Sequence, residues 1–515
     1  MKRTSGFESR FFLLCGSNVL LQGMSFVYRI LISRYAGSEG LGVYRLASAL
    51  YSILHTTCLS GITLSCTRFT SAWKAEKREG AVNCLVRLSF VVFGFLFLSS
   101  SAAVWFGRDY IDGVLFGDRR IVSAIPILLI CLMLTGIENI FKAIMIGLDR
   151  IDNAAISELS EQLIRIVSAV IIFRVFHTED LSKTAVLIFC ASVISEIFSA
   201  AIMSCMYLSM LRIQRSSPPS GYWRDVCKTI FPVSASSLCS SLIASAGSVL
   251  LPKRLIVSGM SNSDAVSELG ILSGVAAPIM TLPMALISSL STVSLPEISA
   301  RFQGHDKKKI HSFSENILRT TGLIALPFTA LLVPLAPTIS RLFFYQPVRQ
   351  EIFILMGLSC ILCYYQIITC CFLNGCGKQG INAIIITCGE VLQLILVWYF
   401  TAMPQLRIYG YVIAQCIAPF LVTVCNLIVL RYFDIIKLNS GSIMIQPLLC
   451  AIMLLLWSRV FFSFYSGFLG QWKALIMTVA CSLILYLFLL RIFDVKIEKY
   501  LSKMVHLHTF HPMFY

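Results

Sequence analysis

Charged residues are scarce in this 515-residue chain. Asp, Glu, Lys and Arg together make up 13% of the sequence, hydrophobic residues make up 57%, and the mean hydropathy is +0.80. Too few polar side chains are left to cover the surface of a soluble globule of this length. The composition therefore excludes a soluble domain and predicts an all-α polytopic membrane protein.

Motifs for common catalytic chemistry are also absent. The sequence has no P-loop, HExxH, nucleophile elbow or glycine-rich dinucleotide turn. Its 19 cysteines lack metal-type spacing, and the CxxC of Cys360 and Cys363 lies in an apolar run, where packing is the expected role. We therefore expect no catalytic residues, no metal site, no cofactor and no enzyme activity, so that any transport uses an ion gradient, the membrane potential or substrate flux.

Apolar runs of about 20 residues, long enough to cross a bilayer, recur along the chain. Fourteen spans are predicted, and we expect them to form two six-helix lobes in parallel repeat plus two C-terminal helices. The spans cover residues 11–33, 43–67, 82–106, 122–147, 156–176, 184–211, 229–251, 266–295, 316–343, 351–373, 381–400, 409–431, 443–465 and 472–493.

The basic residues predict the orientation. Lys and Arg outnumber Asp and Glu, 42 to 26, and gather in short connections between apolar runs, so no nucleic-acid partner is expected. With an even number of spans, the connections on the side of the termini hold 22 Lys and Arg and the others hold 9. This bias predicts a multi-pass protein of the cell membrane with both termini cytoplasmic.

The two halves of the chain repeat weakly. Residues 153–156 followed by Glu161 match residues 382–385 followed by Glu390, at an offset of 229. Six spans per half is an even number, so the repeats share their orientation; chance similarity between apolar helices is the alternative. The predicted parts are an N-lobe (1–211), a cytoplasmic linker (212–228), a C-lobe (229–432) and a C-terminal part with two spans and a cytoplasmic tail (433–515).

Short motifs, in order along most of the chain, suggest a family. They include Phe26-Val27-Tyr28-Arg29, Gly37-Ser38-Glu39-Gly40-Leu41-Gly42-Val43-Tyr44, Ile156-Ser157-Glu158, Pro252-Lys253-Arg254-Leu255, Leu295-Pro296-Glu297-Ile298-Ser299 and Leu373-Asn374-Gly375. Together they resemble the stage V sporulation protein B-like, polysaccharide-transport branch of the MOP exporter superfamily, which also contains the lipid II flippases. The resemblance implies fourteen helices, two six-helix lobes and export of a lipid-linked sugar or peptidoglycan precursor by alternating access.

Arginines in the first hairpin are candidate substrate contacts. An arginine at hydrocarbon depth costs about 2.5–3.5 kcal/mol and usually faces a bundle interior or a wet cavity, although Arg29 also lies within snorkelling reach of the headgroups. The resemblance implies that basic cavity residues hold a pyrophosphate headgroup, whereas Gln22 stands where relatives often have a basic residue. The predicted substrate-binding residues are Arg29, Arg45 and Arg254, the last of which could instead belong to an ordinary charged loop.

Acidic residues within the spans are candidates for coupling. Glu161 and Arg165 are four residues apart in one span, with Glu158 on the same helical face. They predict either a coupling site, at which H⁺ or Na⁺ competes with Arg165, or a fixed structural pair. The remaining candidates are the i, i+4 pair Glu138 and Lys142 and two carboxylates with no partner nearby in sequence, Glu196 and Glu390.

Small residues and prolines mark two further helices. The seventh span has a stripe of serines, which indicates either close helix packing or a hydrated wall: Ser234, Ser237, Ser241, Ser245 and Ser248. In the eighth span, Pro278 and Pro283 predict a bent gating helix.

Three functions are compatible with these features. The first is a flippase that moves a polyprenyl-pyrophosphate-linked saccharide, with membrane lipids and H⁺ or Na⁺ as further partners. The second is a cation-coupled multidrug exporter of the same superfamily, which requires an acidic, aromatic-lined cavity. The third is a non-transporting membrane scaffold for cell-wall or sporulation enzymes. The basic residues in the first hairpin favour the flippase.

Overall fold

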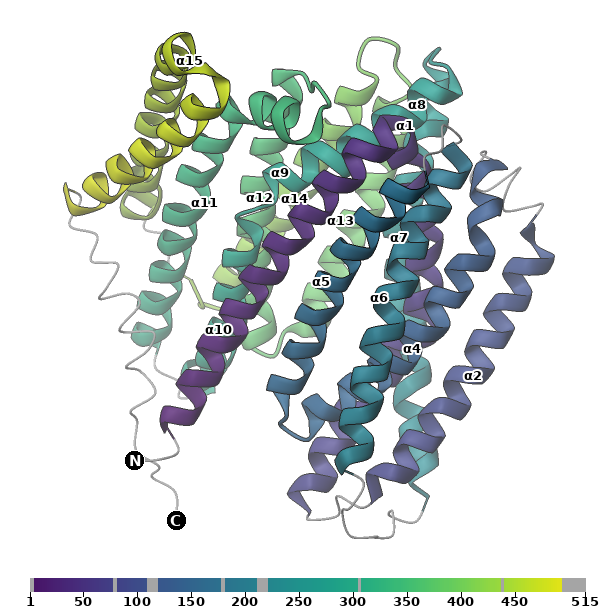
Figure 1. Ribbon diagram of the computed structural model, residues 1–515. Helices are drawn as coiled ribbons and strands as arrows, with labels where there is room; N and C mark the ends of the chain where they lie inside the picture. Colours follow the sequence, from purple (N-terminus) through teal and green to yellow (C-terminus); the bar gives the residue numbers. More distant parts are fainter. Residues whose placement is uncertain are drawn as a thin grey trace. The chain divides into compact units, whose positions relative to one another are not determined.

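The chain is almost entirely helical in the computed structural model, which describes residues 4–76, 81–108, 119–176, 181–210, 221–303, 307–436 and 440–492 (Figure 1). These residues contain no β-strand. The helices are α1 (Thr4–Ala75), α2 (Val82–Phe106), η3 (Arg119–Ala124), α4 (Ile125–Gly147), α5 (Ile151–Val175), α6 (Leu181–Met210), α7 (Tyr222–Val257), α8 (Asn262–Ile271), η4 (Leu272–Ala276), α9 (Ala277–Met280), α10 (Met284–Gln303), α11 (Lys307–Phe344), α12 (Gln350–Gly375), α13 (Gln379–Phe400), α14 (Ile408–Tyr432) and α15 (Ser440–Ile492).

The helical membrane architecture is confirmed, whereas the number of spans stays a prediction. Within the described residues, ten helices are long and apolar enough to cross a membrane, or eleven if the broken helix at 262–299 counts as one span. The counts differ partly because α1 and α15 each contain two predicted spans, which meet at Gly37 (φ 65°) and Gly470 (φ 76°). In addition, α5 carries too many charges to count by hydropathy.

The chain forms two compact units. Unit 1 comprises Met1–Val19, Ala276–Gln393 and Val412–Tyr515, and unit 2 comprises Leu20–Val275 and Leu394–Tyr411. Unit 2 therefore contains α7 and α8 together with the helices of the predicted N-lobe. The division into an N-lobe and a C-lobe stays a prediction. Residues 212–220 of the predicted linker lie outside the described residues.

In unit 2, the turn in α1 contacts α8 through glycines. A Cβ atom added to Gly270 would lie 1.9 Å from the carbonyl oxygen of Ser38, and one added to Gly42 would lie 2.0 Å from that of Val266. No side chain fits at either position, so the two backbones touch. Gly42, which belongs to a motif noted above, therefore has a packing role together with Gly270.

The serine stripe of α7 packs against the second half of α1. Four of its five serines, all but Ser237, are buried. The Ser245 hydroxyl donates a hydrogen bond to the carbonyl oxygen of Ala49 at 3.2 Å, and a Cβ atom on Gly61 would lie 2.3 Å from the carbonyl oxygen of Ile230. These contacts support the close-packing interpretation of the stripe.

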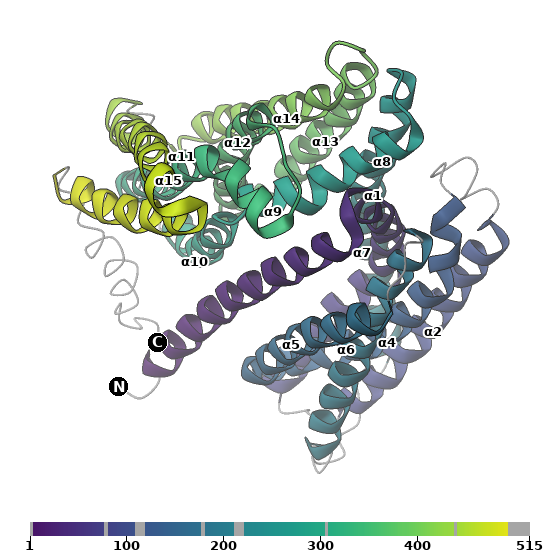
Figure 2. The same cartoon turned by 45° about the horizontal axis from the view of Figure 1, so that its top comes forward.

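Four helices of unit 2, α2, α4, α5 and α6, run side by side. In both views α4, α5 and α6 lie together, with α2 against α4 (Figures 1 and 2). Short connections join α4 to α5 and α5 to α6, so successive helices run antiparallel and present their faces to one another.

Unit 1 is held together mainly by α11, α12 and α15. Both arms of α15 pack on α11, where the Tyr486 hydroxyl donates a hydrogen bond to the carbonyl oxygen of Leu323 at 2.5 Å (Figure 2). The Tyr364 hydroxyl of α12 donates to the carbonyl oxygen of Met280 at 3.1 Å, at the end of α9. The helix breaks between Met280 and Met284, next to Pro283, as the prolines predict.

Candidate functional site

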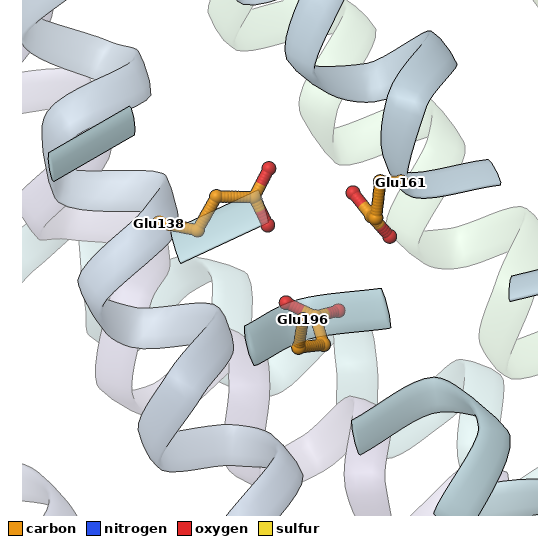
Figure 3. A group of neighbouring side chains, drawn as sticks. All are labelled: Glu138, Glu161 and Glu196. Atoms are coloured by element: carbon orange, nitrogen blue, oxygen red, sulfur yellow. The ribbon is translucent and has the colours of Figure 1, made fainter. Parts of the chain in front are cut away.

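Three buried carboxyl groups meet in unit 2. Glu138 of α4, Glu161 of α5 and Glu196 of α6 each contribute one oxygen atom to a group whose members lie within 4.8 Å of one another. Figure 3 shows the three side chains directed toward a common space from their separate helices. We call this group the carboxylate cluster.

Lys142 is the first counterion of the carboxylate cluster. Its Nζ atom lies 2.9 Å from Glu138 Oε1, one turn earlier on α4, and 3.2 Å from Glu158 Oε1 on α5. The side chain of Lys142 is 14% exposed and that of Glu138 is 2% exposed, so the pair is withdrawn from solvent. The i, i+4 spacing indicates the first contact but not the second, which depends on how α4 and α5 pack.

Arg165 is the second counterion and connects α5 to α6. Its Nη2 atom donates to Glu161 Oε1, one turn earlier, and lies 3.3 Å from Glu196 Oε1. Its Nε atom donates to the Ser195 hydroxyl at 3.2 Å. Glu196, which has no partner nearby in sequence, thus finds one on another helix, and helical periodicity within α6 gives no sign of it.

The two counterions do not satisfy the carboxylate cluster completely. Glu196 Oε2 is buried and has no hydrogen-bond partner within the described residues. Glu138 Oε1 lies near Lys142 Nζ without hydrogen-bond geometry. Leaving a buried polar atom unpaired costs about 1–3 kcal/mol, and more when the group is charged. The carboxyl groups of Glu138 and Glu196 lie within hydrogen-bond reach of each other, so a proton on one of them would let the two share a hydrogen bond.

Hydroxyl groups surround the carboxylate cluster. Ser157 and Ser199, both fully buried, share a hydrogen bond of 2.8 Å between α5 and α6. Ser195 lies beside Glu196 and receives the Arg165 hydrogen bond. Together with the carboxyl groups, these side chains make an oxygen-rich environment in the middle of an apolar bundle.

The two predicted arginines of the first hairpin lie close together on α1. Arg29 and Arg45 are both exposed and lie within electrostatic reach of each other, and Tyr44 lies within reach of Arg29. Neither arginine forms an ion pair or a hydrogen bond with any residue that the structure describes. Two guanidinium groups are thus available to an anionic ligand, and we call them the arginine pair.

Arg254, the third predicted substrate-binding residue, contacts Trp398 rather than Arg29 or Arg45. Its Nε atom donates to the carbonyl oxygen of Trp398 at 2.8 Å, and its guanidinium group lies 4.3 Å from the centre of the Trp398 ring. Among the described residues, no contact joins Arg254 to Arg29 or Arg45. The sequence gives no sign of Trp398 as the partner of Arg254, because the two residues are 144 positions apart and meet only through helix packing.

Glu390 of α13 differs from its repeat counterpart Glu161. It is partly buried, and its Oε2 atom has no hydrogen-bond partner in the described part of the chain. Arg165 follows Glu161 by four residues, whereas Leu394 stands four residues after Glu390. Glu390 belongs to unit 1, whereas the carboxylate cluster belongs to unit 2.

Comparison with known proteins adds independent evidence. Residues 9–302 match the family described as Polysaccharide biosynthesis protein. Stage V sporulation protein B of Bacillus subtilis (strain 168) is 21% identical over 429 residues, covering 80% of this chain and 81% of that protein. Sporulation protein YkvU of the same organism is 19% identical over 337 residues, covering 64% of this chain and 73% of that protein.

Solved structures share the fold. The lipid II flippase MurJ in an inward closed conformation matches with a TM-score of 0.68 and 15% identity, covering 94% of this chain and 98% of that chain. A multidrug resistance MATE family transporter of the MOP superfamily, in its inward-facing conformation, matches with a TM-score of 0.67 and 14% identity, covering 80% of this chain and 94% of that chain. The resemblance inferred from the sequence motifs is confirmed.

Proposed function

The chain belongs to the polysaccharide biosynthesis protein family, and from this premise we propose that it is a flippase for a polyprenyl-pyrophosphate-linked saccharide, most simply a peptidoglycan precursor. The observation that carries the proposal is the arginine pair: two exposed, unpaired cations on a membrane helix. Its matched relatives and neighbours include a sporulation protein and a lipid II flippase, which support a lipid-linked substrate of the cell wall.

A diphosphate suits the arginine pair chemically. Guanidinium groups bind phosphate oxygens through paired, charge-assisted hydrogen bonds, and two of them match the charge of a diphosphate. Placing arginine at membrane depth is costly, so a bound anion recovers part of that cost. The isoprenoid chain would remain in the bilayer while Arg29 and Arg45 hold the headgroup, with Arg254, oriented by Trp398, as a third contact along its path.

In this proposal, alternating access moves the headgroup across the membrane. We take residues 1–211 and 229–432 as the parts that rock against each other, in a cell membrane with both termini cytoplasmic. Such rocking must open the glycine contacts between α1 and α8, at which backbones touch without interlocking side chains. The glycine contacts separate without breaking side-chain hydrogen bonds, whereas the hydrogen bond from Ser245 to Ala49 has to break. A gradient of H⁺ or Na⁺ supplies the energy.

The test is lipid translocation by purified protein in liposomes. Arg29→Ala and Arg45→Ala should reduce translocation of an undecaprenyl-pyrophosphate-linked saccharide, and Arg29→Lys should retain part of it. Arg174→Ala, which removes an exposed arginine from the last turn of α5, is the matched control. Mass spectrometry of co-purifying lipids should show the substrate with the wild type and less of it with Arg29→Ala. Unchanged translocation in both alanine variants would remove the arginine pair from the mechanism.

A cation-coupled multidrug exporter is the second candidate. It is favoured by the fold shared with the MATE transporter and by the buried carboxylate cluster. The drug site of such an exporter would have to be acidic, whereas the exposed Arg29 and Arg45 of α1 are basic. Cation-driven efflux of an organic cation that survives Arg29→Ala would favour the exporter over the flippase.

A further inference from the structure

We propose that the face of α15 around Arg459 binds a transmembrane helix of another membrane protein, one that carries an Asp or Glu at the same depth in the bilayer. This face lies in unit 1, on the first arm of α15 (440–469), whereas the carboxylate cluster and the arginine pair belong to unit 2. The inference concerns a protein partner and does not depend on which lipid the protein moves.

Arg459 is a charged residue in the middle of an apolar span. The helix around it reaches a mean hydropathy of 2.3. Arg459 precedes the break at Gly470 by 11 residues, which is about 17 Å along a helix. The hydrocarbon core of a bilayer is about 30 Å thick, so a residue at that distance from the turn between two spans lies near the centre of the core. An arginine there costs about 2.5–3.5 kcal/mol unless it meets a partner or a watery cavity.

No described residue neutralises Arg459. Its side chain is exposed and forms no ion pair, hydrogen bond or ring contact with any residue that the structure describes, and α15 contains no Asp or Glu. Ser458, the preceding residue, and Leu454 are buried, because this side of α15 faces α11 (Figure 2). The helix therefore directs Arg459 away from the body of unit 1 and toward the lipid.

The residues in line with Arg459 suit a helical partner. Leu448, Ile452 and Leu456 precede it on the same helical face and are 50%, 48% and 58% exposed. Ser463 follows it by four residues and is also exposed. We call these five residues the docking face. A second helix can lie along it, with apolar side chains in contact before Arg459 and a close backbone approach at Ser463.

The charge and depth of Arg459 identify the partner's chemistry. Lipid phosphates lie at the surfaces of the hydrocarbon core, about 15 Å from its centre, and the Cα–Cβ bond of a helical residue points toward the helix N-terminus, away from the nearby turn at Gly470. A second copy of this chain docked through the same face would bring two arginines together. An Asp or Glu on another protein's helix meets Arg459 directly, and each charge offsets the cost of placing the other in the bilayer.

The first test uses a synthetic transmembrane peptide of about 20 Leu and Ala residues with one Glu at its centre. Energy transfer between the labelled peptide and the full-length protein in liposomes should show saturable binding. Replacing the central Glu by Gln should weaken binding by about tenfold or more, the usual contribution of a charged hydrogen bond. Arg459→Leu should weaken binding of the Glu peptide equally and should bind the two peptides alike, as a direct pair does in a double-mutant cycle.

The matched control is Arg491→Leu, which removes an exposed arginine from the last turn of the same helix and should bind both peptides as the wild type does. The second test is photo-crosslinking in native membranes. A photoreactive residue at Ile452 should crosslink to a protein that has an Asp or Glu within a span. This crosslink should disappear when Arg459→Leu is added and persist when Arg491→Leu is added.

The outcomes separate the docking face from the proposed function. Equal binding of the Glu and Gln peptides to the wild type, or crosslinks to lipid alone, would overturn the docking face. Arg459→Leu should translocate lipid as the wild type does in liposomes that contain no other protein, whereas a loss there would assign Arg459 to the transported lipid and overturn the partner. If Arg459→Leu fails to fold, Arg459→Gln, which keeps a polar side chain at this depth, is measured in its place. None of these results bears on the loss of translocation expected for Arg29→Ala.

Discussion

The carboxylate cluster and the arginine pair handle charge within the membrane in opposite ways. In the cluster, Glu138, Glu161 and Glu196 are buried and face cationic side chains from neighbouring helices. In the pair, Arg29 and Arg45 are exposed and have no carboxylate partner in the described residues. Removing one partner of the paired charges in the cluster should therefore lower stability. Removing an arginine of the pair should instead lower ligand binding.

Arg165→Ala should give the largest effect on stability. It leaves Glu161 and Glu196 buried without their cation, and breaking a buried pair in this way costs about 3–5 kcal/mol. We expect a large drop in the unfolding temperature of the purified protein in detergent. Arg120→Ala, which breaks the pair with Glu39 whose side chains are both 23% exposed, should cost about 0.2–1 kcal/mol. Equal losses in the two variants would mean that burial makes no difference to these pairs.

Removal of the arginine pair should lower lipid translocation strongly and change stability little. Arg29→Ala with Arg45→Ala should lower lipid translocation by about 10- to 100-fold per arginine, the equivalent of one charged hydrogen bond of about 1.5–3 kcal/mol. The unfolding temperature should change little, because no internal contact is lost. Translocation in liposomes and thermal unfolding in detergent measure the two effects separately. A strongly destabilised double variant would show that the pair is structural.

Sequence patterns predict those parts of the molecule that depend on one helix. The pairs Glu138–Lys142 and Glu161–Arg165 follow from i, i+4 spacing, and the helical membrane class follows from hydropathy. Contacts between helices do not follow, because they depend on packing. Arg165 to Glu196 and Arg254 to Trp398 are of this kind, and they change the interpretation of both charged regions.

The smallest effect is expected at Glu390, which sharpens the comparison within the repeat. Its counterpart Glu161 is held by Arg165, whereas Glu390 has a buried oxygen with no partner in the described residues. Glu390→Gln removes an uncompensated carboxyl group and should leave the unfolding temperature unchanged or raise it by the equivalent of about 1 kcal/mol. Glu161→Gln in the same assay should lower it, because Arg165 then loses its nearest carboxylate. If both variants lower stability equally, Glu390 has a cationic partner of its own, and the contrast between the two repeats disappears.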